Sequence, residues 1–164
     1  INNKVSETGT LVEITEISKI YESGEMDIKT KGTAVFKVLE QIQELHDKLY
    51  HGAIVTYPQT EYRGRTSFMQ KLVAGIRELH NFLHVSKEFI KPDEDLISFD
   101  VAHHAGMTIE DEYQLLEFDR EMHRQEFIKR HLVKILAVMA QMDLLKNKIK
   151  LNGHFKNLEG FNFS

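Results

Sequence analysis

Nine histidines are the side chains of this 164-residue sequence best suited to metal chemistry. His80 and His84 are four positions apart, so on a helix their imidazoles would project from one face, a spacing found in zinc sites. The hydrolase form of that motif needs Glu directly after the first His, and Asn81 stands there. No spacing rule selects a third ligand. The remaining candidates are His103, His104 and His123. We interpret these histidines as surface or core residues and predict no metal site.

The other familiar catalytic patterns are missing from the sequence. None of the nine glycines precedes a lysine, as a phosphate-binding loop requires, and no Gly-x-Gly or Gly-x-Ser-x-Gly is present. The chain has no cysteine, which excludes thiolate catalysis and disulfides. We therefore predict no catalytic residue, no cofactor-binding residue and no enzyme activity. A metal-dependent enzyme built on the histidines stays open as the weakest alternative.

The composition is that of an ordinary soluble domain. Hydrophobic residues make up 41% of the chain and charged residues 28%, which argues against disorder. The net charge of −4 gives no global attraction to nucleic acid, and no apolar run is long enough to span a membrane. The first residues, 1–4, lack the apolar core of a signal peptide. We therefore expect a cytoplasmic protein that binds neither nucleic acid nor membrane.

Residues 1–57 have the alternation typical of strands. The pattern predicts an antiparallel meander of four short strands: one over 11–20, one beginning at Met26, one over 34–38 and one over 49–55. A bulge near Thr15 would explain why Ile17 and Ile20 fall out of step with Val12 and Ile14. Gly24 suits a turn that needs a positive φ, and Gly32 separates two of the strands.

After Pro58 the apolar period changes from 2 to 3.6, which predicts helices near 66–86, 96–105, 109–117 and 120–149. Thr66 or Ser67 can cap the first helix, Thr108 with Asp111 forms a capping pair, and Gly106 suits a helix end. The last helix carries a stripe of seven apolar residues. These are Ile128, Leu132, Ile135, Met139, Met142, Leu145 and Ile149. Either the rest of the chain or a partner must cover this long-helix stripe. We expect the chain's own core to cover it, packed against the first helix.

Charge is segregated along the helical part of the chain. Residues 93–119 contain nine carboxylates and no lysine or arginine, whereas residues 120–150 contain eight basic and three acidic side chains. Helix-end complementarity and packing of the acidic segment beside the basic helix explain this pattern without a partner. An electrostatic docking surface is the alternative.

Two segments, taken in order, resemble the Lon protease N-terminal family, whose domains are substrate-binding-like. The first is Gly9-Thr10, Ile14, Gly24, Met26-Asp27-Ile28, Gly32 and Phe36-Lys37-Val38. The second is Phe99-Asp100-Val101-Ala102, Met107-Thr108, Tyr113-Gln114-Leu115-Leu116-Glu117 and Arg124. The sequence departs from the family pattern at Val35, where Arg is usual, and at Tyr113, where Lys is usual. The family's first strands would lie before Ile1, so the resemblance implies a β-domain incomplete at its N-terminus.

The resemblance implies an α+β fold in which part of an antiparallel PUA-like β-barrel precedes a C-terminal helical bundle with one long helix. We expect a β-domain over 1–64, a helical domain over 65–150 and a tail over 151–164. It also implies a stand-alone member of the family, or a fragment that lacks the family's first strands. In either case we expect a non-catalytic domain that recognises a polypeptide substrate or acts as an adaptor for a protein partner. The alternative is an RNA-binding PUA-like module. The sequence does not specify the partner or the oligomeric state.

Overall fold

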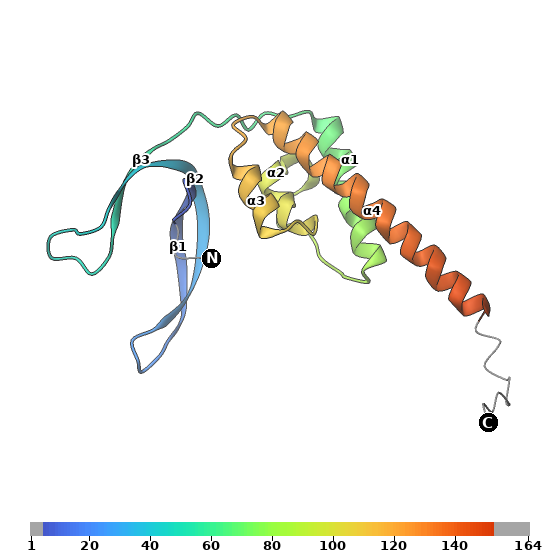
Figure 1. Cartoon of the computed structure of the whole chain (residues 1–164), viewed down its shortest axis with the longest axis horizontal. Helices are drawn as coiled ribbons and strands as arrows, with labels where there is room; N and C mark the ends of the chain where they lie inside the picture. Colours follow the sequence, from blue (N-terminus) through green and yellow to red (C-terminus); the bar gives the residue numbers. More distant parts are fainter. Residues whose placement is uncertain (1–4, 153–164) are drawn as a thin grey trace, which may run out of the picture. The chain divides into compact units, whose positions relative to one another are not determined.

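The change of period at Pro58 divides the fold as the sequence predicts, with strands before it and helices after it (Figure 1). The structure is a computed structural model that describes residues 5–152. The strands are β1 (Thr8–Ile20), β2 (Met26–Ile42) and β3 (Gly52–Thr56). The helices are α1 (Thr66–Phe82), α2 (Ser98–Val101), α3 (Ile109–Leu116) and α4 (Glu121–Asn152), with short 3-10 segments at Asp93–Asp95 (η1) and Ala102–His104 (η2). The chain is therefore α+β. The predicted tail lies outside the described residues, apart from its first two positions, which end α4.

The chain forms two compact units that do not follow simple chain order. One combines Ile1–Arg63 with Thr108–His123, and the other combines Gly64–Met107 with Arg124–Ser164. Helix α3 is therefore grouped with the sheet, and α4 begins in the first unit and continues in the second.

The first unit contains three antiparallel strands in the order β1-β2-β3. Four strands were predicted, and that prediction is wrong because Gly32 pairs with Val12 inside the single long strand β2, where a bulge at Thr33 shifts the register without ending the strand. Leu49, predicted in the last strand, lies instead in the loop before β3 and is fully exposed. The bulge predicted near Thr15 is present, because the pairing shifts register between Ile14 and Glu16. Closure of these strands into a PUA-like barrel stays a prediction.

Hydrogen bonds join α3 to β1 and the segment after α3 to the segment after β3. The Thr8 amide donates to the Tyr113 hydroxyl at 3.1 Å, and the Glu61 amide donates to the Asp119 carbonyl at 2.7 Å. The predicted cap is confirmed, since Thr108 Oγ1 accepts from the Asp111 amide at 3.1 Å and the Asp111 carboxylate accepts in return from the Thr108 amide.

The second unit has its core between α1 and the first half of α4. Gly75 of α1 faces α4, since a Cβ built there would make an ordinary van der Waals contact of 3.5 Å with a Leu132 methyl group. Gly106 has φ +67°, as its predicted place at a helix end requires, and a Cβ there would meet Ile135 and Leu79. The buried apolar residues of this unit are Met69, Leu72, Val73, Ile76, Leu79, Leu96, Val101, Ala102, Ala105, Ile128 and Leu132.

Helix α1 differs from the prediction at both ends. Its N-cap position is Arg65, not Thr66 or Ser67, and the Arg65 carbonyl accepts the first helical amides, from Phe68 and Met69. The helix ends at Phe82, four residues early, because His84 adopts φ +53°. The Val85 amide then donates to the His80 carbonyl, and the His84 amide donates to the Asn81 carbonyl, the pattern of a Schellman end. Likewise, the helix predicted over 96–105 is split into η2 and the shorter α2.

The long-helix stripe has two different environments. Ile128 and Leu132 are buried, Ile135 and Met139 are half-buried, and the last three apolar residues are exposed. Those three are Met142, Leu145 and Ile149. Within the part of the chain that the structure describes, the core therefore covers the first half of the stripe and leaves the second half exposed. None of the helices within residues 5–152 has the length and apolar character needed to cross a membrane.

Candidate interaction surface

The two histidines predicted on one helical face do not share one. His80 lies in α1 and is buried, whereas His84 lies beyond the end of the helix with a positive φ and is exposed. The i, i+4 geometry that a helical zinc pair needs is lost with the last turn of the predicted helix.

His80 instead belongs to a small cluster of rings. Its Nε2 donates to the His104 carbonyl oxygen at 3.1 Å. The His104 ring lies 4.1 Å from the His103 ring and 4.9 Å, edge-on, from the Phe89 ring, measured between centroids. The Nδ1 atom of His104 is buried and has no hydrogen-bond partner among the described residues. Burial lowers the pKa of His104 below its ordinary value, and Coulombic interaction with His103, His80 and Lys87 lowers it further.

The structure places the fifth candidate, His123, edge-on to Phe118, with 6.4 Å between ring centroids. Within residues 5–152, no three His, Asp or Glu side chains gather closely enough to hold a metal ion. The absence of a metal site stays a prediction, which metal analysis of the purified protein would check.

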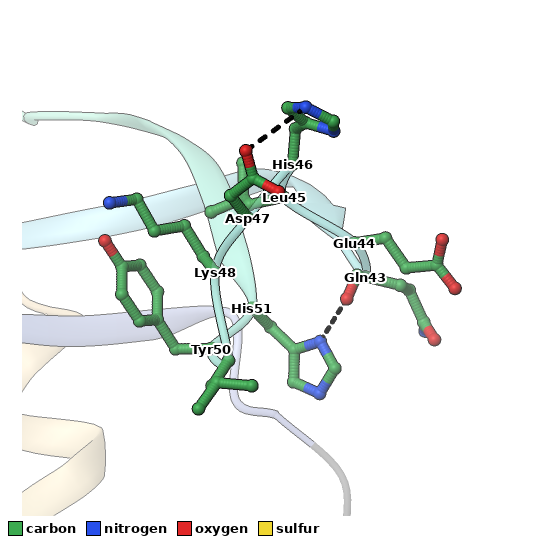
Figure 2. Close-up of a pocket in the computed structure, with 9 residues that line it drawn as sticks. Gln43, Glu44, Leu45, His46, Asp47, Lys48, Tyr50 and His51 are labelled. Atoms are coloured by element: carbon green, nitrogen blue, oxygen red, sulfur yellow. Dashed lines mark hydrogen bonds and ion pairs between the residues drawn. The ribbon is translucent and has the colours of Figure 1, made fainter.

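A hollow of about 520 Å³ lies within the loop between β2 and β3, and Figure 2 shows its lining. One continuous segment, 43–51, forms the whole lining. His51 Nδ1 donates to the Gln43 carbonyl, and His46 pairs with Asp47 at 3.3 Å while both side chains are almost fully exposed. Because such a loop offers neither a buried polar group nor an apolar wall from a second element, we assign no binding role to it.

The β1–β2 hairpin carries an apolar surface that is exposed among the described residues. Residues directly opposite in an antiparallel pair lie on the same face, and Ile17 pairs with Ile28 while Ile20 pairs with Met26. Strand β2 pairs without interruption from Met26 to Gly32, so its alternate residues share that face too. We call this set the apolar hairpin face. Its members are Val12, Ile14, Ile17, Ile20, Met26 and Ile28, which are 45–67% exposed.

Bulges are what bring these side chains together. The apolar residues of β1 are spaced 2, 3 and 3 apart, so strict alternation would send Ile17 to the opposite face from Val12 and Ile14. The register shifts at Ile14/Glu16 and Ile17/Lys19 each insert one residue and restore the apolar residues to one side.

The opposite face of the hairpin is charged, with acidic and basic residues directly across the strands from one another. Glu13 is paired with Lys31 across the strands, Glu16 with Lys29, and Lys19 with Asp27. The Lys29 ammonium lies 2.8 Å from the Glu16 carboxylate, which lowers the pKa of Glu16. The charged face of the hairpin is therefore suited to contact with solvent, whereas the apolar hairpin face is not.

The backbone edges of the hairpin are also open to pairing. The strand order makes β1 an edge strand, and β3 pairs with β2 only from Lys37 onward, so residues 26–36 have one strand neighbour within the described sheet. Unpaired edge amides and carbonyls are a template for adding another strand.

The acidic segment forms ion pairs with bases outside α4. Asp93 pairs with Arg77 through two bonds of 2.8 Å, and Asp100 pairs with Lys91 at 2.8 Å. Arg77 lowers the pKa of Asp93, and Asp93 raises that of Arg77. The other interpretation of the segregated charge, an electrostatic docking surface, stays a prediction.

Among comparisons with known proteins, the match is to a solved structure. No protein-family model matches the sequence, and no curated protein matches it. The structure is similar to the crystal structure of a Lon N-terminal domain protein from Xanthomonas campestris. That similarity has a TM-score of 0.49 and 16% sequence identity, and it covers 77% of this chain and 68% of the other.

The sequence predicts the strands that carry the apolar hairpin face, but it does not predict that these apolar side chains share one exposed face. The predicted bulge at Thr15 was the available signal, because it already placed Ile14 and Ile17 on one side. The second bulge, near Ser18, carries no such mark, since Ser and Lys suit either a turn or a strand face.

Proposed function

We propose that this chain is a non-catalytic polypeptide-binding domain, and that the apolar hairpin face receives an extended apolar segment of another polypeptide. The observation that carries the proposal is the exposure of all six side chains of that face. Exposed apolar clusters of this kind mark interaction sites in soluble proteins. The resemblance to a substrate-binding-like family is consistent with the proposal.

The free edges of the hairpin determine the chemistry of the ligand. An extended segment can pair its backbone with the outer edge of β1, which has no strand neighbour in the described sheet, and place alternate side chains beside the apolar hairpin face. Backbone pairing is independent of sequence, so affinity would depend on apolar content and on an unfolded conformation. The RNA-binding alternative is less well supported here, because each lysine on the opposite face lies directly across the strands from a carboxylate.

Reduced, carboxymethylated lactalbumin is a suitable probe, because it is unfolded and exposes apolar segments. Labelled probe is titrated with the chain and followed by fluorescence anisotropy, with native lactalbumin as the folded control. We expect binding of the unfolded form only. The variant Ile17→Thr/Ile28→Thr keeps β-branched side chains but removes the apolar pair, and should weaken binding by about tenfold or more.

The matched control is Glu16→Thr/Lys29→Thr, a directly neighbouring pair on the opposite face. It should bind like the wild type. Circular dichroism checks that both variants keep the sheet. Failure of the wild-type chain to bind, or equal weakening in both variants, would contradict the proposal.

A further inference from the structure

In the second half of α4, the apolar face of the helix is not covered by any other described residues. Figure 1 shows its last turns continuing past the end of α1. Leu132 is 4% exposed, whereas Met142, Leu145 and Ile149 are 49–61% exposed. An apolar stripe that begins in a core and continues into solvent indicates a helix with a partner for its exposed part.

The spacing of these residues specifies the kind of partner. Ile128, Ile135, Met142 and Ile149 are seven positions apart, and Val138 and Leu145 follow two of them by three positions. This is the a and d pattern of a helix that packs lengthwise against another helix. The first heptad is used inside the fold, where Ile128 is buried and the intervening His131 donates to the Ala105 carbonyl at 3.0 Å. We call Val138, Met142, Leu145 and Ile149 the exposed seam.

Charges beside the exposed seam select the partner. In this register the flanking e and g positions hold exposed Lys134, Lys146 and Lys148 and no carboxylate, while Asp143 lies at a b position. A second copy would present the same lysines and no acidic residue at those positions. The chain's own residues 153–164 contain one lysine and one glutamate, so they do not supply acidic flanks either.

We propose that the exposed seam binds an amphipathic helix of another protein whose apolar stripe is flanked by acidic residues. This site is separate from the apolar hairpin face and takes a helical ligand, not an extended one. Apolar contacts along the seam would supply most of the affinity, and lysine–carboxylate pairs would set partner choice and make binding weaken with salt.

Two designed helical peptides of about four heptads test the charge requirement. Both carry Leu at a and d; one has Glu at every e and g position and the other has Lys. Isothermal titration of the full chain should show binding of the acidic peptide and at least about tenfold weaker binding of the basic one. Lys146→Glu/Lys148→Glu should reverse that preference. Equal binding of the two peptides, or no binding of either, would overturn the proposal.

Neighbouring leucines provide the matched variants. Leu145 lies on the exposed seam and Leu144 lies off it, yet they are 59% and 64% exposed. Leu145→Glu should abolish acidic-peptide binding, and Leu144→Glu should leave it intact. Equal loss in both variants would show general stickiness instead. Sedimentation of the chain alone identifies the other occupant: a dimer lost in Leu145→Glu but kept in Leu144→Glu would mean that a second copy covers the seam, against the proposal.

Discussion

Arg124 is the largest of the fully buried side chains, although its guanidinium is charged. Its Nε donates to Ser98 Oγ at 2.9 Å, and the guanidinium carbon lies 4.5 Å from the centre of the Phe99 ring. Arginine is suited to this position because its planar group combines hydrogen bonding with stacking on an aromatic face. The residue holds α2 against α4, so its role is structural.

Replacing Arg124 with alanine should therefore destabilise the fold. We expect a loss of about 2–5 kcal/mol in the free energy of unfolding, because the change leaves a cavity and removes the donor from a buried hydroxyl. Urea denaturation measures the effect. Arg130→Ala, at an exposed position of the same helix, should change stability by about 0.5 kcal/mol or less. Similar losses in the two variants would contradict this role.

The half-buried ring of His104 makes stability depend on pH. Since the pKa of His104 is lowered in the folded state, the unfolded chain binds a proton more readily. Stability is therefore full above the ordinary histidine pKa of 6.5 and is lost as pH falls from there through the lowered folded value. His104→Gln should reduce this loss, measured as denaturation midpoints between about pH 7 and pH 5. His84→Gln, at an exposed ring, is the control and should retain the wild-type profile.

At the scale of elements, the two halves of α4 make opposite predictions for one substitution. Leu132 is buried opposite Gly75 of α1, so Leu132→Ala should cost about 2–5 kcal/mol of stability. Leu145 is exposed on the same stripe, and Leu145→Ala should change stability by about 0.5 kcal/mol or less. Denaturation midpoints measured for both variants check this. An unchanged midpoint for Leu132→Ala would place the core elsewhere.

Most element types follow from the sequence, and the errors have specific causes. The change of period after Pro58 predicts where helices replace strands, and the Thr108–Asp111 cap and Gly106 mark real helix ends. The end of α1 was missed because a histidine, His84, adopts the positive φ that a glycine usually supplies. The strands around Gly32 were divided because glycine commonly interrupts a strand, whereas here β2 pairs through it.

At the scale of the whole molecule, sequence pattern does not show which apolar surfaces are covered. Ile17 in β1 and Ile128 in α4 are both apolar residues of periodic segments, but only the second is buried. Periodicity reports which side chains share a face, and burial depends on what other parts of the chain reach that face. The candidate surfaces could therefore be predicted as faces but not as exposed faces. The same reasoning explains why the long-helix stripe was only partly predicted.

Net charge is also a property of the whole chain, and it bears on the RNA-binding alternative. The chain has 21 basic and 25 acidic side chains, and described lysines such as Lys29, Lys91 and Lys129 are paired with carboxylates. Because carboxylates outnumber basic residues, the chain as a whole has no net positive charge to attract a phosphate backbone. We expect RNA affinity weaker than about micromolar at physiological salt, without sequence preference.

Filter binding with a structured RNA and a single-stranded RNA of equal length measures this affinity. Raising the salt concentration should remove whatever binding occurs, because only backbone electrostatics would support it. A complex that survives high salt and discriminates between sequences would instead require base contacts, and would favour the RNA-binding alternative.

The variant Lys146→Glu/Lys148→Glu distinguishes a protein partner from RNA as the ligand of the lysines of α4. Loss of acidic-peptide binding with unchanged weak RNA binding would assign these lysines to a protein partner, because RNA affinity spread over many lysines falls little when two are changed.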